Sequence, residues 1–276
     1  MLPGFVQLLG LVVFTAGLLA AAEQRRGAAV TILGGSAALI LGSLGEVWHI
    51  VAPLAERLDR PLFPLFRDYL VETRVGQLAL ARSLLAGIAA GFVPLWLSRM
   101  QGRRSAAIAG GALLIALAYT MAASGHAGGA HGGALLLLVQ WTHLIAAALW
   151  SAIVAALLLR AWREPETLRP ALHRASPAAL GAVLVIAASG LALAWLHGLR
   201  FEALLTDRYG LLVILKVCLL SLSLLPAAYN RYVALRAQPS VPGMTRRIRR
   251  ALSLEGCGIA AILLAAAFLI RTPPPH

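Results

Sequence analysis

The sequence has 276 residues, of which 60% are hydrophobic and only 13% are charged, and its mean hydropathy is +0.81. A soluble domain of this length carries roughly twice that charged fraction, so a soluble globular fold is excluded. The net charge of +13 would indicate nucleic-acid binding only if it were concentrated on one soluble face, but the arginines are spread over the connections between apolar runs, so no nucleic-acid partner is expected.

Apolar runs long enough to cross a bilayer recur along the whole chain. A helix needs about 20 residues to cross a hydrocarbon core of about 30 Å, and a helix satisfies its own backbone groups in lipid. The runs predict eight helical spans, at 5–22, 27–48, 77–98, 105–124, 137–159, 176–197, 210–230 and 251–270. We therefore expect an all-α membrane protein, a polytopic bundle of about eight transmembrane helices, with residues 1–276 as a single integral membrane domain. The longest expected connections are 49–76 and 231–250.

The first apolar run is followed by AAEQRRG, which is similar to a signal-peptide cleavage region. The residues before the run, MLPG, contain none of the lysine or arginine that begins a signal peptide. A retained first span is therefore expected.

The arginines predict the orientation of the spans. Fifteen of them lie in the connections after the first, third, fifth and seventh spans, whereas seven lie in the other connections or after the last span. Because cytoplasmic loops are enriched in Arg and Lys, the larger set is assigned to the cytoplasm. Both termini and the loop SGHAGGAHGG at 124–133 are then expected outside the cytoplasm.

Six of the seven histidines fall on that outer side. At a rise of about 1.5 Å per residue, counting from the cytoplasmic arginines places several polar residues in one layer near the outer membrane boundary. This outer layer contains Glu46, His49, Arg82, His126, His143, His197 and Lys216. Since ionisable residues in spans are costly, by default they mark a site or a pathway.

Within the outer layer, His126 and His143 are the strongest candidates for a ligand pair. They come from consecutive spans that a glycine-rich loop joins, and they share a predicted depth. Neutral imidazole ligates copper well and also ligates haem iron. His131 is either a third donor or a solvated loop residue, and the second interpretation is favoured. A structural alternative for His143 is a hydrogen bond between helices.

Two acidic residues have both functional and structural interpretations. Glu46 lies three residues before His49 in GEVWH, so the two share a helical face and can act as further metal ligands or form an interfacial polar pair. Glu255 lies inside the last span, where it can mark an intramembrane site or pair with an arginine of RRIRR at 246–250.

The sequence contains no HExxH, GxSxG or phosphate-binding glycine loop, so no catalytic residue is predicted. Several segments are distinctive in combination: VETRVGQLALARSLL at 71–85, SGHA at 124–127, HLIAAALW at 143–150, ASGLALA at 188–194, DRYGLLVILK at 207–216, YNR at 229–231 and LSLEGCGIAAILLAAAFLIRTPPP at 252–275. With these segments the sequence resembles the copper resistance D (CopD) family of bacterial inner-membrane proteins, over about residues 70–275. One departure is SAIV after HLIAAALW, where the family commonly has Gly-Gly.

The resemblance implies copper ion transport or delivery across the bacterial inner (plasma) membrane, in copper homeostasis or tolerance. It supplies His126 and His143 as the positions that bind the metal. The partners it implies are the copper ion and a periplasmic copper-binding protein. One physical objection is that Arg82 and Lys216 lie at the same depth, because cations near a cation site oppose binding. Glu46 can offset one of them.

A haem b-binding redox protein is the alternative. His126 and His143 would be the axial ligands, and Arg82 and Lys216 would pair with the haem propionates at the outer surface. A structural interpretation of these two cations is that their long stems carry the charge to the membrane boundary.

Overall fold

The computed structural model describes residues 2–22, 27–99, 103–125, 133–199, 201–234, 236, 243–269 and 272. These residues form helices and no strand, so the prediction of an all-α protein is confirmed for the part of the chain described. The chain divides into two compact units, residues 1–145 (unit 1) and 146–276 (unit 2), and the division falls inside α6 (Gly133–Arg163). Each unit is described by itself, and a single membrane domain over 1–276 stays a prediction.

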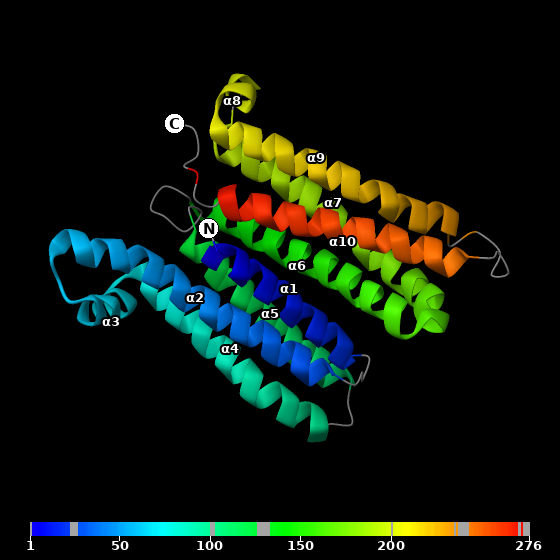
Figure 1. Ribbon diagram of the computed structural model, residues 1–276, viewed down its shortest axis with the longest axis horizontal. Coiled ribbons are helices and arrows are strands. Elements are labelled where there is room, and N and C mark those ends of the chain that lie inside the picture. The colour runs from blue at the N-terminus through cyan, green and yellow to red at the C-terminus, as the bar shows by residue number, and fades with distance from the viewer. Residues whose placement is uncertain are drawn as a thin grey trace. The chain divides into compact units, whose positions relative to one another are not determined.

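Unit 1 is a set of long helices with one short helix folded against them (Figure 1). In addition to the start of α6, it contains α1 (Leu2–Ala22), α2 (Ala28–Leu58), α3 (Leu62–Glu72), α4 (Arg74–Arg99) and α5 (Arg103–Ser124). Helix α1 packs along α2, α4 packs on α2 and α5, and α5 also contacts α1. Each of α1, α2, α4 and α5 therefore contacts two others of this group.

Glycines allow the close packing of α1 on α2. A Cβ atom added to Gly35 would lie 2.4 Å from the backbone nitrogen of Phe14, and one added to Gly42 would lie 2.7 Å from Cγ of Gln7. Small residues let transmembrane helices approach backbone to backbone in this way. In contrast, a Cβ atom on the neighbouring Gly34 would meet nothing within 4 Å.

Residues 49–76 are helical for most of their length, which the sequence analysis did not predict. Helix α2 continues to Leu58, and α3 follows it. The reason is that the buried stripe Val47, Val51 and Ala55 continues at helical spacing. Val47 and Val51 form a buried cluster with Ala79 of α4, and residues of α3 including Phe66 pack against that cluster.

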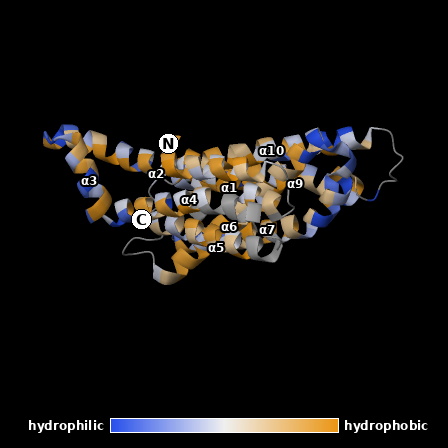
Figure 2. Cartoon of the chain, turned by 90° about the horizontal axis from the view of Figure 1, so that it is seen from below, coloured by the Kyte–Doolittle hydropathy of each residue, from blue (hydrophilic) through white to orange (hydrophobic). Residues whose placement is uncertain are grey.

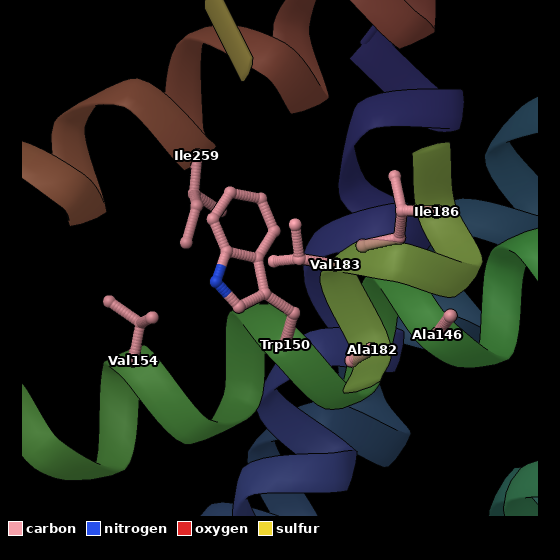
Figure 3. Close-up of a cluster of buried hydrophobic side chains, with 7 residues drawn as sticks. All are labelled: Ala146, Trp150, Val154, Ala182, Val183, Ile186 and Ile259. Atoms are coloured by element: carbon pink, nitrogen blue, oxygen red, sulfur yellow. The ribbon is translucent and has the colours of Figure 1, made fainter. Parts of the chain in front are cut away.

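Unit 2 contains the rest of α6 and a second set of helices (Figure 1). They are the short 3-10 turn η2 (Pro165–Thr167), α7 (Leu168–Leu196), α8 (Phe201–Thr206), α9 (Arg208–Tyr229), the π-helix η3 (Asn230–Ala234) and α10 (Met244–Leu269). The core of unit 2 surrounds Trp150 of α6. Its ring lies among side chains of α7 and α10, including Val183 and Ile259 (Figure 3).

Six helices among the described residues are long and apolar enough to cross a membrane. They are Leu2–Ala21, Ala28–Leu58, Gly133–Arg163, Pro165–Leu196, Arg208–Ala234 and Met244–Leu269. Figure 2 shows hydrophilic residues at the turn between α2 and α3 and near the start of α10, with apolar residues along most helices. The remaining two expected spans coincide with α4 and α5, so the count of eight and the outward termini stay predictions.

Candidate functional site

Arg82 of α4 is the centre of a buried polar cluster in unit 1. Its side chain is 0% exposed, which overturns the interpretation that its stem carries the charge to the membrane boundary. Nε donates a hydrogen bond to Oγ1 of Thr120 at 3.2 Å, and Nη2 donates to the carbonyl of Thr120 at 3.0 Å and to Oγ of Ser124 at 2.8 Å. These bonds attach α4 to α5.

The other guanidinium nitrogen of Arg82 joins α4 to α1 and α2. Nη1 donates to Oε1 of Gln7 at 2.6 Å and lies 3.5 Å from Oγ of Ser43. The same nitrogen lies 3.6 Å from Oε2 of Glu46. A guanidinium has five N–H donors on three nitrogens. Each of the three nitrogens of Arg82 has at least one acceptor in the protein.

Gln7 closes this network. Its Nε2 donates to Oε2 of Glu46 at 2.7 Å and to the carbonyl of Gly42 at 3.0 Å, while its Oε1 accepts from Arg82. The absence of a side chain at Gly42 allows α1 to come close enough for both contacts. We call Gln7, Ser43, Glu46, Arg82, Thr120 and Ser124 the Arg82 cluster. Glu46 offsets the charge of Arg82, and each guanidinium nitrogen of Arg82 has an acceptor. The free-energy cost of burying the charged Arg82 side chain among the helices is therefore low.

The predicted histidine ligands are placed only in part. His49 is exposed on α2, three residues after Glu46, and His143 is half-buried on α6. His126 and His131 lie outside the described residues. Within the ranges that the structure describes, no group of three or more His, Cys, Asp or Glu side chains can hold a metal ion. The shared site of His126 and His143 therefore stays a prediction.

His197 and Lys216 lie in unit 2. His197 caps the C-terminus of α7, and its ring lies 6.1 Å from that of Tyr209 at the start of α9, in an edge-on arrangement. Lys216 is half-buried in the middle of α9. Their roles as an intramembrane polar residue and as a propionate partner stay predictions.

Glu255 of α10 belongs to a second buried polar group. It is 4% exposed, and its Oε1 accepts a hydrogen bond of 3.1 Å from Nε1 of Trp150. Among the described residues it forms no ion pair with the arginines of 246–250, so that structural interpretation is wrong. One of those arginines, Arg249, instead lies over the ring of Trp162, 4.2 Å from its centroid.

Glu255 and Trp150 line a pocket of about 270 Å³ in unit 2. Most of its wall is apolar, from α6, α7 and α9, and its polar lining residues are Ser176, Asn230, Arg231, Tyr232 and Glu255. Asn230 is 2% exposed, and neither its amide nitrogen nor its amide oxygen has a hydrogen-bond partner among the residues that the structure describes. The apolar pattern predicts only that a span ends at residue 230, and it gives no sign that the amide of Asn230 is buried.

Residues 169–269 match the model of a family described as Copper resistance protein D. One curated relative is the protein named Copper transport protein CutJ from Bacillus subtilis (strain 168), which is 32% identical over 169 residues. That alignment covers 59% of this chain and 30% of the relative, so the chain spans less than a third of the length of the relative it matches. No solved structure matches the chain.

The matched residues all lie in unit 2, and they are fewer than the 70–275 that the motifs suggested. His126 and His143 precede them, so the family match does not extend to the predicted ligand pair. The resemblance is nevertheless confirmed in the part that carries α7, α9 and α10. Residues 169–269 are thus similar to the copper resistance protein D family.

Proposed function

We propose that this membrane protein transports or delivers copper ions across the bacterial inner membrane and so contributes to copper homeostasis and tolerance. The observation that carries the proposal is the match of residues 169–269 to the copper resistance protein D family. The name of the curated relative, a copper transport protein, supports it, as do the six helices that are long and apolar enough to cross a membrane.

In this proposal, His126 and His143 bind the ion on the outer side, with His49 and Glu46 near the same boundary. Neutral imidazole nitrogen suits copper. The main electrostatic objection is weaker than the sequence alone suggested, because the charge of Arg82 is offset by Glu46 at 3.6 Å. A periplasmic copper-binding protein would supply or receive the ion.

The same geometry makes the haem alternative less favourable. A propionate bound to Arg82 would have to replace acceptors that Arg82 already has in Gln7, Thr120 and Ser124. It would also have to enter a place where the side chain is 0% exposed. Copper as cargo requires neither change.

The experiment is metal analysis and absorption spectroscopy of the purified protein after loading with Cu(I) or Cu(II). The proposal expects bound copper and no Soret band, and expects most copper to be lost in His126→Ala and in His143→Ala. His131→Ala and His173→Ala are the matched controls and should keep their copper. A Soret band, or full copper content in both ligand variants, would contradict the proposal.

A further inference from the structure

The pocket of unit 2 combines a buried carboxyl group with a buried amide that has no hydrogen-bond partner in the described part of the chain. Both Glu255 and Asn230 line it, and they are 4% and 2% exposed. A buried amide without hydrogen bonds costs on the order of 1–3 kcal/mol. Neither amide atom of Asn230 has a partner among the described residues, so a molecule that enters the pocket can supply the missing hydrogen bonds.

The local backbone explains why Asn230 faces this pocket. Pro226 lies one turn earlier in α9, and the chain then widens from an α-helix into the π-helix Asn230–Ala234. Single π turns inside long helices occur frequently at functional sites. The widened turn places Asn230, Arg231 and Tyr232 together on the lining of the pocket.

The volume of the pocket and the few polar groups in its mainly apolar wall allow it to hold water. A pocket of about 270 Å³ has room for several molecules, because one water occupies about 30 Å³ in the liquid. An amide both donates and accepts, so Asn230 can hold a water on each side. Ser176 Oγ accepts a hydrogen bond of 2.6 Å from Nη1 of Arg231 and can donate its own hydrogen into the pocket.

The carboxyl group of Glu255 has no nearby positive charge paired with it in the described part of the chain. Its one hydrogen-bond donor in the described part of the chain is Trp150, which is neutral, and no cation there forms an ion pair with it. An ionised carboxylate in such surroundings is costly. The charged or titratable groups that line the same pocket are Arg231 and Tyr232, both of η3, whereas α6 and α7 contribute none.

A bound metal ion is poorly suited to neutralise the carboxylate of Glu255. The side-chain oxygens that line the pocket are those of Glu255, Asn230, Ser176 and Tyr232, whereas copper prefers nitrogen and sulfur ligands. The guanidinium of Arg231 lines the same pocket and repels a metal cation. A proton needs only one carboxylate oxygen and a chain of water that reaches it.

We propose that the pocket of unit 2 is a hydrated proton-binding site, in which Glu255 takes up and releases a proton through water held by Asn230. The proton arrives on a water of the pocket as hydronium and bonds to Oε2 of Glu255, the oxygen that Trp150 does not contact, which leaves a neutral carboxylic acid and a neutral water. Release is the reverse. This inference goes beyond copper transport and does not depend on it.

Infrared difference spectroscopy of the full chain in lipid bilayers tests the site. The wild-type protein should show the C=O stretching band of a protonated carboxyl at neutral pH, and the band should shift in deuterated water because solvent exchanges the proton. Glu255→Gln should remove this band, whereas the control Glu166→Gln, at an exposed glutamate of η2, should keep it. Asn230→Leu should keep the band. The rate at which the band shifts in deuterated water should fall by about tenfold or more, because leucine cannot form hydrogen bonds to water in the pocket.

A band that survives Glu255→Gln, or no protonated carboxyl at neutral pH, would overturn the proposal. If Glu255→Gln does not insert into the membrane, Glu255→Asp makes the same assignment, because a band from Glu255 moves in frequency and a band from elsewhere does not. A wild-type rate of deuterium shift in Asn230→Leu would remove Asn230 from the site. None of these readouts involves copper, so failure of the copper proposal and failure of this one are distinguishable.

Discussion

Gln7 and Arg82 lie 75 residues apart in the sequence, and Oε1 of Gln7 accepts a hydrogen bond of 2.6 Å from Nη1 of Arg82. Through the same amide, Gln7 also donates to Glu46. One neutral side chain on α1 therefore connects the cation of α4 to the carboxylate of α2. The Arg82 cluster is thus a polar joint among four helices of unit 1.

Removing the guanidinium of Arg82 from the Arg82 cluster should destabilise the protein strongly. We expect Arg82→Leu to lower the free energy of unfolding by about 3 kcal/mol or more, because it leaves the buried acceptors of the cluster unpaired. Arg82→Lys should be intermediate, since an ammonium group has three donors and no planar fork. Unfolding in mixed detergent micelles, followed by circular dichroism, measures both.

Arg67→Leu is the matched control for these variants. Arg67 is 74% exposed and forms its ion pair with the adjacent Asp68 at 2.9 Å. Its loss should change stability by no more than about 0.5 kcal/mol. Equal effects of Arg82→Leu and Arg67→Leu would contradict the structural importance of the cluster.

The close contact of α1 and α2 gives a sharper test, because two adjacent glycines differ in their surroundings. Gly35→Ala should destabilise the protein by about 1–3 kcal/mol, since the new methyl group would overlap the backbone of Phe14. Gly34→Ala should be neutral or stabilising by up to about 1 kcal/mol, because alanine favours the helix and meets no atom there. The same unfolding measurement compares them, and equal losses would show that α1 does not pack on this face of α2.

The hydrogen bond between Trp150 and Glu255 can be measured by a double-mutant cycle. Trp150→Phe keeps an aromatic ring in the core of unit 2 but removes the N–H that Glu255 accepts. We expect this substitution to cost more in the wild-type background than in Glu255→Leu, with a coupling free energy of about 1–2 kcal/mol. Additive effects would mean that the two side chains do not interact in the folded protein.

Orientation in the membrane is a further prediction from the arginine distribution. In a background with Cys218→Ala and Cys257→Ala, a cysteine at Gly129 should react with an impermeant thiol reagent added outside the cell. A cysteine at Gln101 should react only after the cytoplasm is opened. Reaction of Gly129→Cys from the cytoplasmic side alone would reverse the topology and remove the basis of the outer layer.

Much of the helical framework could be predicted from apolar runs. Each of the eight expected spans coincides with an observed helix, because a run of about 20 apolar residues has few alternatives in lipid. The residues at which the helices end were less predictable. Helix α2 passes beyond residue 48 to Leu58 since Val51 and Ala55 continue its buried stripe among charged residues.

The polar sites were predictable only where a charge marked them. Arg82 and Glu46 were assigned to one layer by counting residues, and they lie 3.6 Å apart. Gln7 was missed because a neutral amide in an apolar run resembles any tolerated polar residue. Asn230 was missed because its burial depends on a π-helix, which no spacing of apolar residues predicts.

Copper flux in proteoliposomes tests the central claim most directly. The protein is reconstituted in sealed vesicles that contain a copper-sensitive dye, and copper entry is compared among the wild-type protein, His126→Ala, His143→Ala and His131→Ala. The account predicts that the wild-type protein and His131→Ala carry copper faster than protein-free vesicles, and that either ligand variant reduces the rate by at least about tenfold. Flux at the protein-free rate in the wild-type protein, or unchanged flux in both ligand variants, would contradict it.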